Sequence, residues 1–151
     1  MGCDIHIFVE CKKSANGEKR WVNVDKWKIL PDYFDDSFEP TFECEHLYAD
    51  RNYYIFSILA NVRNDDRVKY ISKPRGLPSN VSKIVNKEYT EDGAYHSCSW
   101  LTLDELKTFN KQNKQNILDP LINILQEKKE SYDWMNGKRD SSLRIVFWFD
   151  S

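Results

Sequence analysis

The dipeptide Asn16-Gly17 and the residues before it constrain the fold more than any other feature of the chain. Residues 5–11 alternate between apolar and polar side chains, which is the period of a β-strand with one buried face. Asn-Gly after such a run is the strongest short signal for a two-residue hairpin turn. Counting outward from the turn pairs like with like: Cys11 with Val22, Val9 with Val24, Glu10 with Asn23, and Phe8 with Asp25. The sequence therefore predicts a hairpin whose second strand covers residues 18–27, in a register that a slip of one residue would destroy.

Four helical patterns and one more strand follow the hairpin. The helices are predicted at residues 52–62, at about 79–85, from just after Trp100, and from Asp119 to Gly137. Each has a signal for its start: Asp50 or Asn52, Ser79, a capping box of Thr102 and Glu105, and the pair Asp119-Pro120. Residues 143–150 are apolar at nearly every position, which is typical of a central strand buried on both faces.

The length of 151 residues allows one hydrophobic core and leaves no room for two. Strands at both ends with helices between them predict a single α+β domain over residues 1–151. We expect a mixed or antiparallel sheet that contains the N-terminal hairpin and the C-terminal strand, with about four helices between them. Residues 31–50 combine seven acidic and five aromatic residues with no Lys or Arg. We interpret them as a long irregular loop, either a lid or binding loop or a solvated acidic strap.

Composition and charge exclude several classes of protein. The 22 basic and 24 acidic residues give a net charge of −2, so the chain lacks the positive excess of a protein that coats extended nucleic acid. No run approaches the roughly 18 apolar residues of a membrane span, and the N-terminus has no secretory signal pattern. The four cysteines form no CxxC pair, which makes reduced thiols the expected state. We expect a soluble domain that stays in the compartment where it is made.

A row of polar side chains on one face of the first strand is the most informative feature for function. Asp4, His6 and Glu10 share that face, and the hairpin register adds Asn23 and Asp25 from the neighbouring strand. Carboxylates and imidazoles are the groups that bind divalent metals or transfer protons. We interpret the row as a candidate site in which Glu10 or Asp25 is the general base. The alternative is an ordinary hydrophilic sheet face.

His96 is the second candidate, because it stands directly before the capping box with several hydrogen-bonding neighbours. We expect it to join Asp4 and His6, with Cys98 as a further candidate, in holding a zinc-like ion, since imidazole, thiolate and carboxylate are the ligands such ions prefer. A neighbouring serine is a nucleophile only if His96 is its base, and no G-x-S-x-G elbow supports that reaction. A histidine bonded within its own turn is the alternative.

Three arginines near the ends of predicted elements are candidates for anion binding: Arg51, Arg63 and Arg75. Guanidinium groups suit phosphate and carboxylate, and the aromatic residues of the chain suit a stacked base. We assign substrate binding to Arg51, Arg75 and Trp100. Each of these residues taken alone is equally an ordinary surface residue.

Five blocks of the chain are specific enough to compare with known families: MGCDIHIFVE at the start, RNYYIFSILANVRN, PRGLP, HSCSWLTLDEL, and RIVFWFD near the end. Together they resemble a family of small proteins of phage and prophage genomes that brings with it no established reaction. That family tends to have a second histidine where this chain has Cys98, and cysteine can replace histidine as a metal ligand. The resemblance implies a phage or prophage gene product that acts in the cytoplasm of the bacterial host.

These observations give two main hypotheses about function. The first is a metal-dependent hydrolase of a phosphate-containing small molecule, with Zn²⁺ or Mn²⁺ as the metal. Its residues are the ligands Asp4, His6 and His96, the base Glu10 or Asp25, and the phosphate-binding Arg51 or Arg75. The second is a binding protein without catalysis that sequesters a host nucleotide signal or inhibits a host defence protein. A structural role in the virion comes third, since nothing in the sequence indicates a repeating assembly surface.

Overall fold

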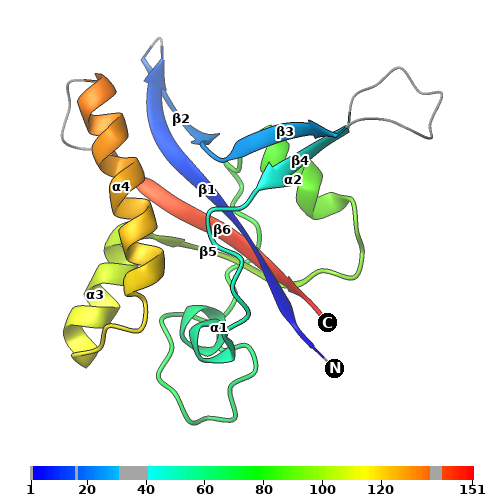
Figure 1. Ribbon diagram of the computed structural model, residues 1–151, viewed down its shortest axis with the longest axis vertical. Coiled ribbons are helices and arrows are strands. Elements are labelled where there is room, and N and C mark those ends of the chain that lie inside the picture. Colours follow the sequence, from blue (N-terminus) through cyan, green and yellow to red (C-terminus); the bar gives the residue numbers. More distant parts are fainter. Residues whose placement is uncertain (1, 16, 31–40, 137–140) are drawn as a thin grey trace.

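The centre of the computed structural model is a four-stranded antiparallel sheet, and the structure describes residues 2–15, 17–30, 41–136 and 141–151 (Figure 1). The sheet has the order β2-β1-β6-β5, formed by β1 (Asp4–Ala15), β2 (Glu18–Asn23), β5 (His96–Thr102) and β6 (Leu143–Asp150). A separate pair joins β3 (Lys26–Leu30) to β4 (Thr41–Glu45). The C-terminal strand therefore lies beside the first strand, as the sequence predicts.

The described residues form four helices, which confirms the α+β class. They are α1 (Tyr53–Ala60), α2 (Lys83–Thr90), α3 (Leu103–Asn113) and α4 (Asp119–Asn136). Asn52 caps α1 by accepting hydrogen bonds from two backbone N–H groups, and the capping box of Thr102 and Glu105 starts α3 as predicted. The predicted cap of α2 is wrong. Ser82 occupies that position because residues 78–81 form a turn before the helix, closed by a hydrogen bond from Val81 N to Pro78 O.

The hairpin register is confirmed, because Cys11 pairs with Val22 and Glu10 with Asn23. The predicted second strand is too long, however, since β2 ends at Asn23. The Asp25 side chain accepts a hydrogen bond from Val9 N at 2.9 Å, in place of the backbone carbonyl that a longer second strand would offer to β1. Beyond this point the chain leaves the sheet, and β3 pairs with β4 instead.

Three strands were not predicted as separate elements, and of these β3 overlaps the predicted second strand only at residues 26–27. Part of the predicted long loop, residues 41–45, forms β4, while residues 31–40 and the predicted helix stop Gly137 lie outside the described residues. Residues 96–102, interpreted as a turn, form the edge strand β5. A bulge between His96 and Ser99, with Ser97 at φ 55°, interrupts the alternation by which a strand is recognised.

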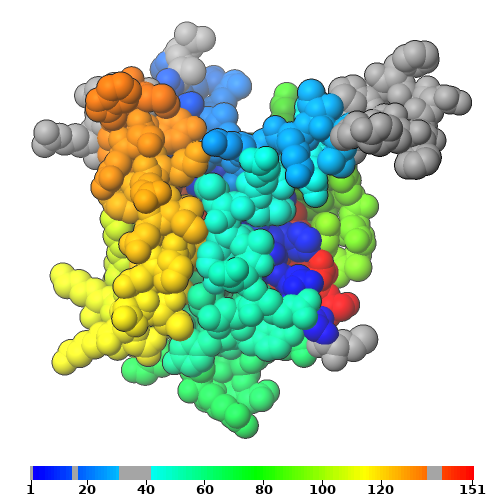
Figure 2. Space-filling model, viewed as in Figure 1, coloured from blue at the N-terminus to red at the C-terminus, as the bar shows by residue number. Residues whose placement is uncertain are grey.

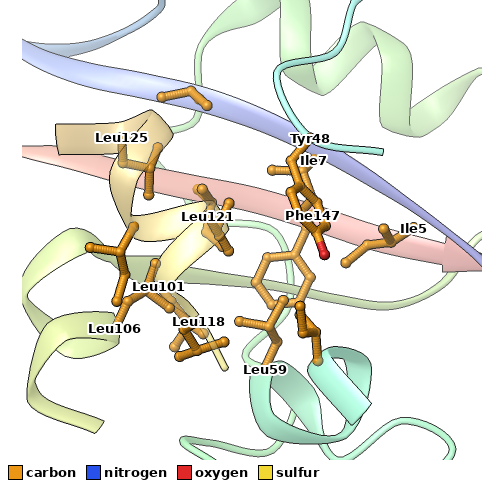
Figure 3. Packing of buried hydrophobic residues seen from close by; sticks show 14 of the residues in the cluster. Ile5, Ile7, Tyr48, Leu59, Leu101, Leu106, Leu118, Leu121, Leu125 and Phe147 are labelled. Carbon is orange, nitrogen blue, oxygen red and sulfur yellow. The ribbon is translucent and has the colours of Figure 1, made fainter. Parts of the chain in front are cut away.

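The sheet separates two apolar clusters. On one face, alternate residues of β1 and β6 pack against α1, α3 and α4, as Figure 3 shows for Ile5, Ile7 and Phe147 against Leu59 and Leu121. On the other face, Phe8, Val146 and Trp148 pack against Val85 of α2 and Cys44 of β4. The second face holds a smaller core, and charged residues stand at both of its ends.

The four cysteines are all buried and carry free thiols. Among the described residues, no helix is long and apolar enough to cross a membrane. Neither finding conflicts with the expectations from the sequence.

Candidate functional site

The candidate site lies where β1 begins and β6 ends, on the face of the sheet that α2 covers. In the ladder, Asp4 pairs with Asp150 and His6 with Trp148, so these side chains share that face. Figure 2 shows atoms of the first and last residues, in blue and red, reaching the surface side by side at the right of the view. We call this place the strand-end site.

His6 and Asp150 form the central pair of the site. Nε2 of His6 lies 2.6 Å from Oδ2 of Asp150, and the two side chains are 28% and 37% exposed. Because a carboxylate accepts hydrogen bonds, Nε2 carries the proton and the neutral ring has its lone pair on Nδ1. A carboxylate that fixes an imidazole in this way prepares the other nitrogen to accept a proton or to bind a metal.

Aromatic rings surround His6 on several sides. The ring centroids of Tyr95 and Trp148 lie 5.1 Å and 6.4 Å from that of His6. Trp148 is 1% exposed and also contacts Phe8 and Tyr89, so it forms an apolar floor beneath the imidazole. Its Nε1 is buried and has no hydrogen-bond partner among the described residues. The surroundings of His6 therefore exclude water on the side of the sheet.

His46 follows β4 and faces the same ring. Its centroid lies 6.2 Å from that of His6, at an interplanar angle of 71°. Nδ1 of His46 lies 3.1 Å from the carbonyl oxygen of Ile7, and its ring contacts Phe8 edge to face. The site thus holds two imidazoles, one from β1 and one from the segment after β4.

Glu88 of α2 and Tyr95 complete the ionisable groups around the two imidazoles. Burial raises the pKa of the Glu88 carboxyl, the nearby Glu91 raises it further, and the charges of His46 and His6 act in the opposite direction. Burial also raises the pKa of the Tyr95 phenol, and neighbouring carboxylates add to this effect. The charge of Glu88 therefore acts on both histidines from α2.

Arg51 joins the site through Asp4. Its Nε and Nη2 both lie 2.7 Å from Oδ1 of Asp4, and this hydrogen bond lowers the pKa of the carboxyl. Both side chains are about half exposed. A guanidinium has five N–H donors, so a single carboxylate oxygen does not exhaust its capacity to bind an anion.

The structure does not bring His96 to His6. His96 pairs with Phe149 in the ladder and stacks on its ring, so it lies on the opposite face of the sheet. Its two ring nitrogens contact the hydroxyls of Ser97 at 3.0 Å and Ser151 at 2.8 Å. The predicted ligand set of Asp4, His6 and His96 is therefore split between two faces, because the bulge in β5 shifts His96 by one position relative to β6.

Glu10, one of the two predicted bases, is fully buried. Its Oε1 accepts hydrogen bonds from Nε and Nη2 of Arg144, and its Oε2 accepts one from the backbone N–H of Ser82. Arg144 also bonds Oδ1 of Asn80. This arrangement holds the loop before α2 against the sheet and leaves Glu10 away from the strand-end site.

The other predicted residues have different surroundings. Asp25 is held by Val9 N and Asn23 Nδ2, and burial raises the pKa of its carboxyl. Arg75 pairs with Glu105 and lies over the ring of Trp100 at 4.9 Å. Trp100 pairs with Val146 of β6, four residues before Asp150, so Arg75 lies away from the strand-end site. Arg51 and Arg75 thus lie on different parts of the molecule.

Cys98 is buried in the second cluster, and burial raises the pKa of its thiol to about 12. A thiol that resists deprotonation is a poor metal ligand, since the thiolate is the binding form.

Asp4, His6 and Arg51 were predicted from the sequence, whereas four other residues at or near the site were not: Asp150, His46, Glu88 and Tyr95. A signal existed for Asp150, because a terminal carboxylate on a strand expected beside the first one is a natural partner for a histidine near its start. For the other three, which come from three separate segments, spacing in the sequence carries no such information.

Among the residues that the structure describes, no three His, Cys, Asp or Glu side chains are arranged closely enough to form a ready metal site. Comparisons with protein-family models, with curated proteins and with solved structures find no match to this chain. Its function must therefore be argued from the site.

Proposed function

We propose that the protein is a hydrolase of a phosphate-containing small molecule and that its reaction centre is the strand-end site. The observation that carries the proposal is the 2.6 Å contact between His6 and Asp150, which is about one-third exposed to solvent and leaves Nδ1 of His6 available to accept a proton or bind a cation. Hydrolysis needs an activated water, and an oriented imidazole activates water either as a base or by holding a cation. His6, oriented by Asp150, takes the role of general base that was expected from the sequence for Glu10 or Asp25.

Arg51 supports a phosphate-bearing substrate. It lies at the same end of the sheet, since its partner Asp4 pairs with Asp150 in the ladder. Guanidinium groups bind phosphate through paired N–H donors. The ring of Tyr95 lies 5.1 Å from that of His6 and offers a face on which a nucleobase can stack.

The test is turnover of a panel of cyclic and linear nucleotide phosphodiesters by the full chain, with products followed by chromatography. Substitution His6→Gln should reduce turnover at least about 100-fold, as expected on losing a general acid–base or metal-binding group. His96→Gln is the matched control, because this histidine lies on the other face. Loss of turnover in His96→Gln alone, or no turnover of any substrate by the wild type, would reject the proposal.

The second candidate is a binding protein without catalysis. The half-buried rings of Tyr95 and, behind it, Tyr89 favour it, because they suit a stacked ligand equally well. In this case the nucleotide is recovered chemically unchanged after incubation and heat release. A host nucleotide signal or a host defence protein is the partner that the phage resemblance implies.

A further inference from the structure

The two imidazoles of the strand-end site each have one nitrogen committed to an acceptor. Nδ1 of His46 lies 3.1 Å from the carbonyl oxygen of Ile7, and a carbonyl only accepts, so this nitrogen carries the proton. Nε2 of His6 donates in the same way to Asp150. The lone pairs of the neutral rings are therefore on Nε2 of His46 and Nδ1 of His6, the nitrogens without these bonds.

This is the arrangement of metal-binding histidines. Such residues donate the second ring N–H to a carboxylate or a backbone carbonyl, which fixes the tautomer and the ring orientation. Here one histidine has the carboxylate and the other has the carbonyl.

The distance between the rings is close to what one shared ion requires. With metal–nitrogen bonds of about 2.0–2.1 Å and a tetrahedral angle, two imidazole centroids are about 5 Å apart. The observed separation is 6.2 Å. An approach of roughly 1 Å is within the range of side-chain adjustment, and the exposed ring of His46 has room to make it.

We propose that His6 and His46 bind a divalent cation of the zinc or manganese type. The charge of Glu88 on α2 interacts with both imidazoles and adds a negative potential that favours a cation there. Water completes the coordination, consistent with the lack of a ready group of three ligands among the described residues. The ligand set thus keeps His6 and replaces His96 and Asp4 by His46.

The apolar floor favours this site. Trp148 and Phe8 exclude water from the sheet side of the two rings, and electrostatic attraction between a cation and a carboxylate strengthens where water is excluded. Water on such a cation loses a proton near neutral pH and becomes a nucleophile. This last step rests on the proposed function, whereas binding of the metal does not.

The experiment is titration of the metal-free full chain with Zn²⁺ by calorimetry and with Co²⁺ by visible absorption. The wild type should bind one equivalent. His6→Gln and His46→Gln should each lose binding, and Asp150→Asn should weaken it about 10–100-fold, the effect usual for a residue that orients a ligand. His96→Gln should bind as the wild type does. Far-UV circular dichroism of each variant separates loss of binding from loss of fold.

Two results would overturn the inference: no binding by the wild type, or binding that persists in His46→Gln and disappears in His96→Gln. The outcomes also separate the inference from the proposed function. Metal binding without turnover keeps the site and rejects the hydrolase. Turnover that depends on His6 in metal-free protein rejects a catalytic role for the cation and leaves His6 as the base, while the titration alone decides whether the metal binds.

Discussion

Two pairs of charged or ionisable residues join β1 to β6 on the same face of the sheet, and they differ in what surrounds them. Glu10 and Arg144 are 0% and 3% exposed, and both carboxylate oxygens have partners. His6 and Asp150 are 28% and 37% exposed, and one ring nitrogen stays available. The first pair closes the sheet against the loop before α2, while the second opens to solvent. The types of residue alone do not distinguish these two pairs. Their burial and the number of hydrogen-bonding groups left without a partner do.

The largest loss of stability should come from breaking the pair of Glu10 and Arg144. Arg144→Met leaves the Glu10 carboxylate buried without its charged partner, and such a change costs about 3–5 kcal/mol. Urea unfolding followed by fluorescence measures it. In the double variant Glu10→Leu/Arg144→Met no charge is left buried, and most of the free energy of unfolding should return. A loss below about 1 kcal/mol in the single variant would show that the pair is not structural.

The pair of Arg75 and Glu105, which is about one-third exposed, should have an intermediate effect. The hydrogen bond from Arg75 lowers the pKa of the Glu105 carboxyl below its ordinary value of 4.5. The pair therefore stabilises the fold fully above pH 4.5, and this contribution is lost as the pH falls through the folded pKa. Glu105→Gln keeps the capping box and should cost up to about 1 kcal/mol at neutral pH.

That cost should shrink in acid, where the wild-type carboxyl also becomes neutral. The measurement is the free energy of unfolding at neutral pH and at steps below 4.5 for both proteins. Glu18→Gln, in the exposed pair with Arg20, is the matched control and should show no such dependence. A cost for Glu105→Gln that is independent of pH would assign the effect to the cap and not to the charge.

The pair of His6 and Asp150 should contribute less to stability than to function. His6→Gln should change the free energy of unfolding by less than about 1 kcal/mol, since the pair is partly solvated. The same variant should lose metal binding and turnover. If instead it unfolds as readily as Arg144→Met, the two pairs are both structural and the comparison fails.

The smallest effect on stability is expected for Arg51→Gln. Arg51 and Asp4 are both about half exposed, so the thermal midpoint should stay within experimental error. The Michaelis constant for a phosphate-bearing substrate should rise if Arg51 contacts the phosphate, while metal binding is unchanged. An unchanged Michaelis constant would remove Arg51 from the substrate site.

The hairpin and the last strand were predictable because their patterns are local. Alternation in β1, the Asn-Gly turn and the apolar run of β6 each specify strand structure without help from distant residues. The edge strand β5 was not, because the bulge at Ser97 breaks its alternation. The same bulge determines on which face of the sheet His96 lies. Because the bulge was not predicted, His96 was wrongly grouped with Asp4 and His6 in the predicted metal site.

The alternation of side chains along β1 correctly placed His6 and Glu10 on one face, but this alternation carries no information about burial. Glu10 is covered by the loop before α2, and nothing in the sequence of β1 indicates that cover. His46 was similarly inaccessible to sequence reasoning, because its approach to His6 depends on how the β3–β4 pair folds over the sheet. Long-range packing therefore determines which of the polar residues are available to a ligand.

Because Asp4 at the start of β1 pairs with Asp150 at the end of β6, the chain enters and leaves the sheet at the end that carries His6 (Figure 1). A purification tag fused at either end would emerge next to the two imidazoles. An oligohistidine tag would add ligands of the same kind within reach, and it would mimic or mask the binding under test. Removal of the tag, or its insertion into a loop far from this edge, is thus a condition for interpreting any metal titration of this protein.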